Sequence, residues 1–143
     1  MRLLAVRARS ERELRLRLQK RGLGKNAIDE CLASLRRVGL VNDAEFATSW
    51  VESRMRLRPM GRRALRRELR EKGIEEDLAR AAVEAAVGDE AELQAARAVA
   101  LRYIGPNPPR DAIRRAQQAL MRRGFDSAIV WQVLENIAAS EAD

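Results

Sequence analysis

The 143-residue sequence has no histidine, one cysteine and one tyrosine. Without histidine, neither a His–Ser or His–Cys relay nor a histidine-ligated metal site can form. Cys31 alone excludes an internal disulfide, a CxxC motif and a cysteine-based zinc site. Apolar runs are only a few residues long, and MRLLAVRARS is charged too soon for a secretory signal. We therefore expect a soluble cytoplasmic protein that is not an enzyme and has no membrane segment, metal or cofactor.

Large aromatic side chains are also scarce, because they make up only 3% of the chain, whereas 24 residues are alanine. Such side chains suit thin seams between helices better than a single thick core. Charged residues of both signs reach 34%, as is typical of long solvated helix faces. The β-branched alternation of strands is absent. Composition thus predicts an all-α protein.

Three glycines, Gly22, Gly73 and Gly124, stand 51 residues apart, and the sequence around them repeats without gaps. In each copy a leucine stands four residues before the glycine, an arginine or lysine one before, and a large apolar residue one after. A fixed period of about 50 residues indicates a repeat array. Each glycine is expected to end a helix in the left-handed conformation, with the next side chain folding back onto that helix.

This pattern predicts an all-α fold of three tandem three-helix repeats in an elongated, curved array, divided at 1–39, 40–88 and 89–143. The helices are expected at 2–8, 11–21 and 25–37, at 43–57, 62–72 and 75–87, and at 89–104, 111–123 and 126–138. Ser10 with Glu13, Asn42 with Glu45, and Asp126 are candidate helix N-caps. Because about 50 residues make a marginal domain, neighbouring repeats are expected to lean on one another.

Two groups of large side chains have alternative interpretations. Phe46, Trp50 and Val51 most simply supply packing between helices, although a ligand role is the alternative. Trp131 falls where the other repeats have polar residues, Asp29 and Arg80. It either covers a packing gap near the C-terminus or lies exposed as a contact, and we favour the first interpretation.

The net charge of +7 alternates in sign along the chain. Residues 1–25 and 53–72 each carry nine basic and two acidic residues, and 97–123 carry seven and one, whereas the intervening segments are acidic. The second helix of each repeat is therefore basic. If the repeats stack in line, these helices form a stripe. The simpler alternative is that helices of opposite charge pair and the surface is merely solvated.

The densest basic segment has eight arginines in 17 residues, with Glu68 as its only acid: Arg54, Arg56, Arg58, Arg62, Arg63, Arg66, Arg67 and Arg70. Such a cluster repels itself, and a polyanion relieves that repulsion. Guanidinium groups hold phosphates and carboxylates bidentately. Aromatic residues are too few for a base-stacking platform. Nucleic-acid binding would then be electrostatic, sensitive to salt and nearly indifferent to sequence.

Three segments carry a resemblance to a known family: LLAVRARSERELRLRLQKRG at 3–22, GLVNDAEFATSWVESR at 39–54 and RRALRRELREKGIEEDL at 62–78. Together they resemble the RecX family of recombination regulators. The resemblance implies a bacterial cytoplasmic protein of tandem three-helix repeats with no catalytic residue. It also implies that the partner is the RecA recombinase filament on DNA, whose strand exchange and ATP hydrolysis such proteins inhibit.

We expect the contact surface for the RecA filament and the DNA phosphate backbone to be centred on the second repeat. Its central residues are Arg62, Arg63, Arg66, Arg67, Arg70 and Lys72. The flanking contacts are Arg12, Arg15, Arg21, Arg114, Arg122 and Arg123. The protein is expected to act as a monomer.

Two other functions compete with this hypothesis. One is a stand-alone DNA-binding protein without sequence preference. The third helices are acidic or apolar, which argues against reading bases in a DNA groove. The other is an inert helical scaffold, which predicts no salt-dependent affinity for DNA or filaments.

Overall fold

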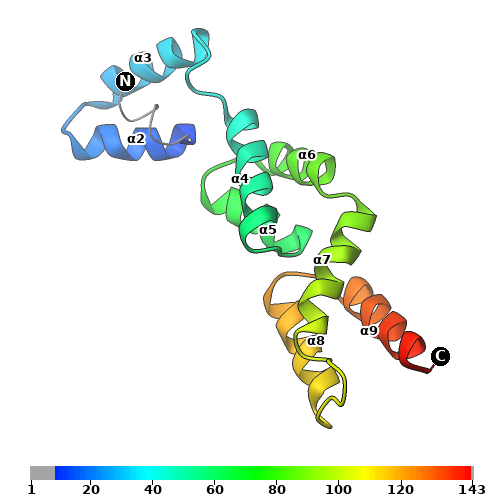
Figure 1. The fold of residues 1–143 in the computed structure, drawn as a ribbon. Coiled ribbons are helices and arrows are strands. Elements are labelled where there is room, and N and C mark those ends of the chain that lie inside the picture. The colour runs from blue at the N-terminus through cyan, green and yellow to red at the C-terminus, as the bar shows by residue number, and fades with distance from the viewer. Residues whose placement is uncertain (1–8, 143) are drawn as a thin grey trace.

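The computed structural model describes residues 9–142, which are helical and contain no strand over that range. The expected helix at 2–8 lies outside the described residues. The helices, in chain order and with the labels of Figure 1, are α2 (Glu11–Lys20), α3 (Lys25–Arg37), α4 (Asp43–Leu57), α5 (Arg62–Glu71), α6 (Glu76–Ala86), α7 (Asp89–Leu101), α8 (Ala112–Arg122) and α9 (Ser127–Ala142).

The observed helix ends lie close to the expected ones, with two informative differences. Helix α9 continues to Ala142 instead of ending at 138, because no glycine or proline interrupts its last turns. Helix α7 ends at Leu101 instead of 104, and the following turn buries Ile104, whose N–H donates to the Ala100 carbonyl at 3.0 Å. The other helices agree with the expectation to within one residue at each end.

The helices form three groups that follow one another in an extended row, with α2 and α3 at one end and α8 and α9 at the other (Figure 1). Helix α2 packs on α3, helices α4 to α6 pack together, and helices α7 to α9 pack together. Each group encloses its own core, built around Leu32, Leu65 and Leu120 respectively. Met55 packs against both the second and the third core. The predicted all-α tandem array with thin seams is confirmed.

The three glycines of the 51-residue period end the second helix of each repeat. Gly22, Gly73 and Gly124 have φ of +88°, +90° and +82°. Around Gly73 the Gly73 and Ile74 N–H groups donate to the Arg70 and Leu69 carbonyls, both at 3.0 Å, as in a Schellman motif. Ile74 and Phe125 fold back and are buried, whereas Leu23 stays 39% exposed. The folding back is therefore complete only in the second and third repeats.

Of the expected packing residues, Phe46 and Val51 are buried and Trp50 is half-buried against the same core. The predicted caps also form. Asn42 accepts from the Ala44 and Glu45 N–H groups, and Asp126 accepts from the Ile129 N–H. The Ser10 hydroxyl accepts from the Glu13 N–H at 3.2 Å. These local signals in the sequence were sufficient to place the starts of α2, α4 and α9.

The repeats meet through the ends of their second helices. At the first junction the Ser10 hydroxyl, before α2, donates to the carbonyl of Lys72, at the end of α5, at 2.8 Å. At the second junction the Gly61 N–H, before α5, donates to the carbonyl of Arg123, at the end of α8, also at 2.8 Å. Both partners are displaced by 51 residues from one junction to the next. A hydrogen bond between equivalent positions therefore forms at both junctions, and the basic second helices meet end to end.

A carboxylate from the next repeat adds a hydrogen bond at each junction. Asp43 of α4 accepts from the Glu11 N–H at the start of α2 at 3.0 Å. Glu92 of α7 accepts from the Arg62 N–H at the start of α5 at 2.8 Å. A carboxylate is favourable there because the N-terminal N–H groups are unpaired and the helix dipole is positive at that end. Helices α2 and α5 are therefore each capped by a side chain from outside their own repeat.

We expect Gly61→Ala to loosen the second junction. An added Cβ would lie 2.5 Å from the Phe125 nitrogen and closer still to the Gly124 carbonyl, and this backbone cannot rotate away. The expected loss is about 1–3 kcal/mol of unfolding free energy, as for an overpacked core. Gly24→Ala is the matched control, because Gly24 is also an N-cap, with φ −75° against −73°, and has open space around it.

Urea unfolding followed by circular dichroism measures both variants. Gly24→Ala should lose only about 0.5–1 kcal/mol, the cost of alanine in place of glycine at an N-cap. Equal losses in the two variants would show that the contact between the repeats contributes nothing.

Candidate nucleic-acid interface

Helix α5 presents its arginines to solvent because its other face is buried in the core. Ala64, Leu65 and Leu69 are buried at helical spacing. Four arginines on the other side of the helix are exposed or half-exposed: Arg63, Arg66, Arg67 and Arg70. Four guanidinium groups thus line the outer side of one short helix.

A polar groove runs between α5 and α6. It has a volume of about 290 Å³ and is lined by Arg63, Arg66, Arg70, Glu76, Ala79 and Arg80. A second hollow of about 190 Å³ shares Arg63 and Arg66 and reaches Glu92 and Asp126 of the third repeat. The groove therefore opens toward the junction with the third repeat.

Few carboxylates neutralise this groove. Arg80 pairs with Asp77 at 2.8 Å, but the Arg70–Glu76 pair is long, at 3.9 Å, and exposed. In residues 9–142, no carboxylate lies within 4.0 Å of the guanidinium groups of Arg63, Arg66 or Arg67. Phosphate oxygens match the planar fork of these side chains, so the groove suits a polyanion.

Arg62 is placed differently from its neighbours on α5. Its Nε and Nη2 atoms lie 3.1 Å from Glu92 and 2.8 Å from Asp89. Burial is the largest single effect on the pKa of Arg62 and lowers it. The hydrogen bonds and charges of Asp89 and Glu92 together outweigh burial, so the pKa of Arg62 is raised above its ordinary value. Its guanidinium group thus holds the second repeat to the third.

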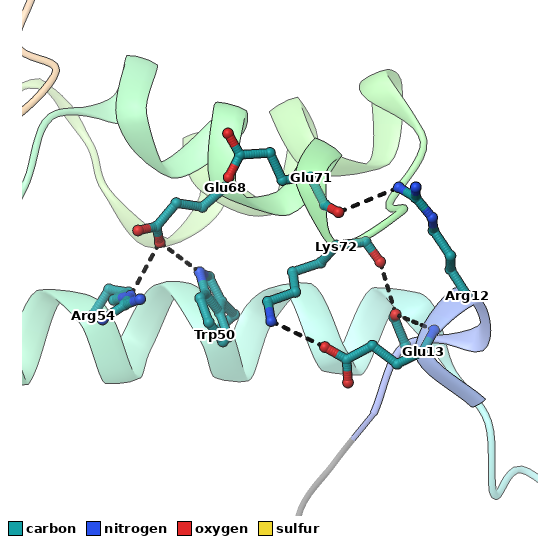
Figure 2. Close-up of polar contacts among 8 residues, drawn as sticks. Arg12, Glu13, Trp50, Arg54, Glu68, Glu71 and Lys72 are labelled. Atoms are coloured by element: carbon teal, nitrogen blue, oxygen red, sulfur yellow. Dashed lines mark hydrogen bonds and ion pairs between the residues drawn. The ribbon is translucent and has the colours of Figure 1, made fainter. Parts of the chain in front are cut away.

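Lys72 is likewise engaged at the first junction, as Figure 2 shows. Its Nζ atom lies 3.1 Å from Glu13 and 5.1 Å from the centre of the Trp50 ring. Arg12 donates to the Glu71 carbonyl at 3.2 Å, and its side chain lies against Gly73. Beside them, Glu68 accepts from Trp50 and Arg54 at 2.9 and 3.0 Å (Figure 2). The contacts of Lys72 with Glu13 and of Arg12 with Glu71 fasten the first repeat to the second, whereas those of Glu68 hold α5 to α4.

The remaining predicted contacts flank the α5–α6 groove on both sides. Arg15 pairs with Asp29 at 2.8 Å, and Arg21 is exposed at the end of α2. Arg114 and Arg122 are exposed on α8. Arg123 is half-buried, and its Nη1 atom lies 3.4 Å from the Pro59 carbonyl. Burial first, and then the charges of Arg102 and Arg58, lower the pKa of Arg123, so an anion bound there would relieve this repulsion.

The structure thus sorts the predicted residues into two sets. Arg63, Arg66, Arg67 and Arg70 are brought together with their charges largely available, whereas Arg62 and Lys72 hold junctions. Sequence reasoning missed Arg80, since it stands in an acidic segment, and only the packing of α6 on α5 brings it to the groove. It also missed Arg102, which lies in the basic segment 97–123 but was not singled out within it. The role of all these residues as contacts stays a prediction.

Two further features bear on the class of protein. Among the described residues, no group of acidic or cysteine side chains is placed to hold a metal ion. Over residues 9–142, every helix is too short or too polar to cross a bilayer.

Comparisons with known proteins agree on one family. The descriptions "RecX, first three-helix domain", "RecX, second three-helix domain" and "RecX, third three-helix domain" match residues 1–35, 42–83 and 89–134. The regulatory protein RecX of Amycolatopsis mediterranei is 39% identical over 136 residues, which cover 93% of this chain and 77% of the relative. That of Mycobacteroides abscessus is 38% identical over 146 residues, covering 100% and 72%.

Solved structures agree with the fold. The crystal structure of RecX from Lactobacillus salivarius superposes with a TM-score of 0.86 at 20% identity, over 96% of this chain and 91% of that chain. A second crystal structure of a regulatory protein RecX gives 0.82 at 24% identity, over 93% and 66%. From its three consecutive domain matches and its relatives of more than 30% identity, this chain belongs to the RecX family of regulatory proteins.

Proposed function

We propose that this protein binds the RecA recombinase–DNA filament and inhibits its strand exchange and ATP hydrolysis, acting as a monomer in the cytoplasm. The observation that carries the proposal is the α5–α6 groove, where Arg63 and Arg66 lack carboxylate partners among the described residues. Membership of a family of regulatory proteins supports it.

The mechanism follows from charge and shape. The row of repeats lies along the filament, with the guanidinium groups of α5 on DNA phosphates or on acidic protein surface. Contacts from neighbouring repeats bridge successive recombinase protomers. Occupation of the filament groove blocks entry of a second duplex and alters ATP turnover, and no reaction is carried out by this chain itself.

The alternative is a stand-alone DNA-binding protein without sequence preference. It is favoured by the same groove, because unneutralised guanidinium groups bind phosphates with or without a recombinase. A binding assay with and without the recombinase separates the two functions. Tight binding to naked DNA that the recombinase does not improve would favour the alternative.

The test is ATP turnover by the cognate recombinase on single-stranded DNA, titrated with this protein at 50 and 200 mM salt. We expect inhibition at the lower salt. With four phosphate contacts on a single strand, the half-inhibiting concentration should rise by roughly 50-fold at the higher salt. Unchanged turnover at both salt concentrations would contradict the proposal.

A further inference from the structure

The third repeat has a groove in the same place as the arginine-lined groove of the second. It lies between α8 and α9, has a volume of about 530 Å³ and is lined by Ile113, Gln117, Met121, Ser127, Val130, Trp131, Leu134, Glu135 and Ala138. The 51-residue period relates it to the α5–α6 groove. Met121 takes the place of Arg70, and Trp131 takes the place of Arg80. Equivalent positions are therefore charged in one repeat and apolar in the next.

In the first repeat the equivalent positions carry ion pairs. Arg15 pairs with Asp29 and Arg36 with Glu11, both at 2.8 Å. These ion pairs cross from α2 to α3 and neutralise the charges at those positions. In the described part of the chain, the groove of the second repeat therefore keeps cations that no carboxylate neutralises, and the groove of the third keeps exposed apolar side chains.

The apolar side chains of the α8–α9 groove are not needed by the core beneath them. Trp131 is 70% exposed, Ile113 56% and Met121 55%. The core of the third repeat is complete without them, since Leu120, Val130 and Ile137 are already buried there. The sequence-based preference for Trp131 as a cover over a packing gap is therefore wrong. Large apolar side chains gathered in an exposed groove indicate a surface that a partner covers.

The chemistry of the groove favours a protein partner over nucleic acid. An aliphatic floor offers phosphates no donors, and a single tryptophan is too little for a platform that stacks successive bases. Beside the floor, α8 carries exposed Arg114 and Arg122 and no acidic residue. A complementary partner brings an apolar ridge with acidic residues along the edge that faces α8. An amphipathic helix has that pattern and fits a groove between two helices.

We propose that the α8–α9 groove docks an amphipathic helix of the recombinase, apolar on one face and acidic along one edge. This inference rests on the proposed function. It assigns different contacts to the second and third repeats. The second repeat holds phosphates through guanidinium groups, and the third holds protein through Trp131, Met121 and Ile113. Equivalent grooves of the two repeats thereby bind two different ligands.

Fluorescence of Trp131 tests whether the groove is covered. In Trp50→Phe, Trp131 is the only tryptophan, and acrylamide quenching reports its accessibility. Filament assembled on single-stranded DNA should lower the quenching constant severalfold, whereas the same DNA alone should leave it unchanged. Protection by naked DNA would identify nucleic acid as the occupant and overturn the inference.

Sedimentation with the filament shows whether the docking inference fails alone or together with the proposed function. If the protein sediments with the filament and Trp131 stays fully quenchable, the docking inference fails and the proposed function stands. If the protein does not sediment with the filament at all, both fail. Sedimentation together with protection of Trp131 supports both.

A charge-matched pair of variants supplies a second readout. Met121→Arg with Trp131→Arg places the side chains of the second repeat in the third, and both positions are exposed, so folding is not at risk. Filament affinity should fall by about tenfold or more, as for central contacts of an interface, while affinity for naked DNA should not fall. Gln118→Arg with Gln132→Arg adds the same charge at exposed positions outside the groove. Equal filament affinities for the two double variants would overturn the inference.

Discussion

Arg66→Glu together with Arg70→Glu is expected to abolish inhibition of the recombinase filament. Affinity should fall on the order of 100-fold at 0.1 M salt, because two cations that face phosphates become two anions. The salt dependence should weaken at the same time, since fewer counterions are released. Titration of ATP turnover at several salt concentrations measures both effects.

The same substitutions should leave the fold intact. Arg66 and Arg70 point away from the buried side of α5, and glutamate favours a helix about as strongly as arginine. Within residues 9–142 the only ion pair lost is Arg70–Glu76, which is 3.9 Å long and exposed and so contributes about 0–1 kcal/mol. Circular dichroism should therefore show unchanged helix content.

Lys25→Glu together with Arg37→Glu is the matched control. It changes the net charge by the same amount at exposed positions of α3, where no ion pair within residues 9–142 is broken. We expect it to inhibit nearly as well as the original protein. If both double variants lose inhibition equally, net charge and not the α5–α6 groove carries the binding. Normal inhibition by the Arg66/Arg70 variant would show that the surface is assigned wrongly.

Glu92→Ala is expected to cause the largest loss of stability, about 2–4 kcal/mol of unfolding free energy. Glu92 is only 2% exposed and has two roles, because it caps α5 through the Arg62 N–H and pairs with the Arg62 guanidinium. Its removal leaves a helix-terminal donor and a half-buried cation without their main partner. The second and third repeats should then separate more readily.

Asp89→Ala removes the other carboxylate from the same arginine. The Asp89 side chain is 88% exposed, so its pair with Arg62 is screened by solvent and should contribute less than about 1 kcal/mol. Denaturant unfolding of the two variants measures the difference, and amide hydrogen exchange at the start of α5 locates it. Equal losses of unfolding free energy in the two variants would contradict the assignment of Glu92 as the main carboxylate that joins the second repeat to the third.

Much of the fold could be predicted because its signals are local. The left-handed glycines at 22, 73 and 124, and the caps at Asn42 and Asp126, act within one helical turn of their own positions. Their 51-residue spacing repeats one such unit, which gave the tandem array. The end of α9 was misplaced because no residue after 138 gives a stop signal, and helix propensity alone does not set a boundary.

The candidate site was predicted less completely because a guanidinium group is available only if no carboxylate reaches it. Arg62 and Arg66 look alike in the sequence, one turn apart on the same helix. Glu92 comes from another repeat and engages Arg62, whereas Arg66 keeps its charge for the groove. The exposure of Trp131 could not be predicted for the same reason, because only the packing of α8 on α9 decided whether its ring is covered.

The sequence by itself determined where the helices begin and where most of them end, that the unit is repeated, and that the second helices are basic, since these depend on neighbours within a few residues. The tertiary structure alone decided which arginines remain unpaired and which side chains line the grooves of the second and third repeats. Those outcomes depend on side chains that meet across about 15 to 30 positions of the chain, such as Arg15 with Asp29 and Arg62 with Glu92.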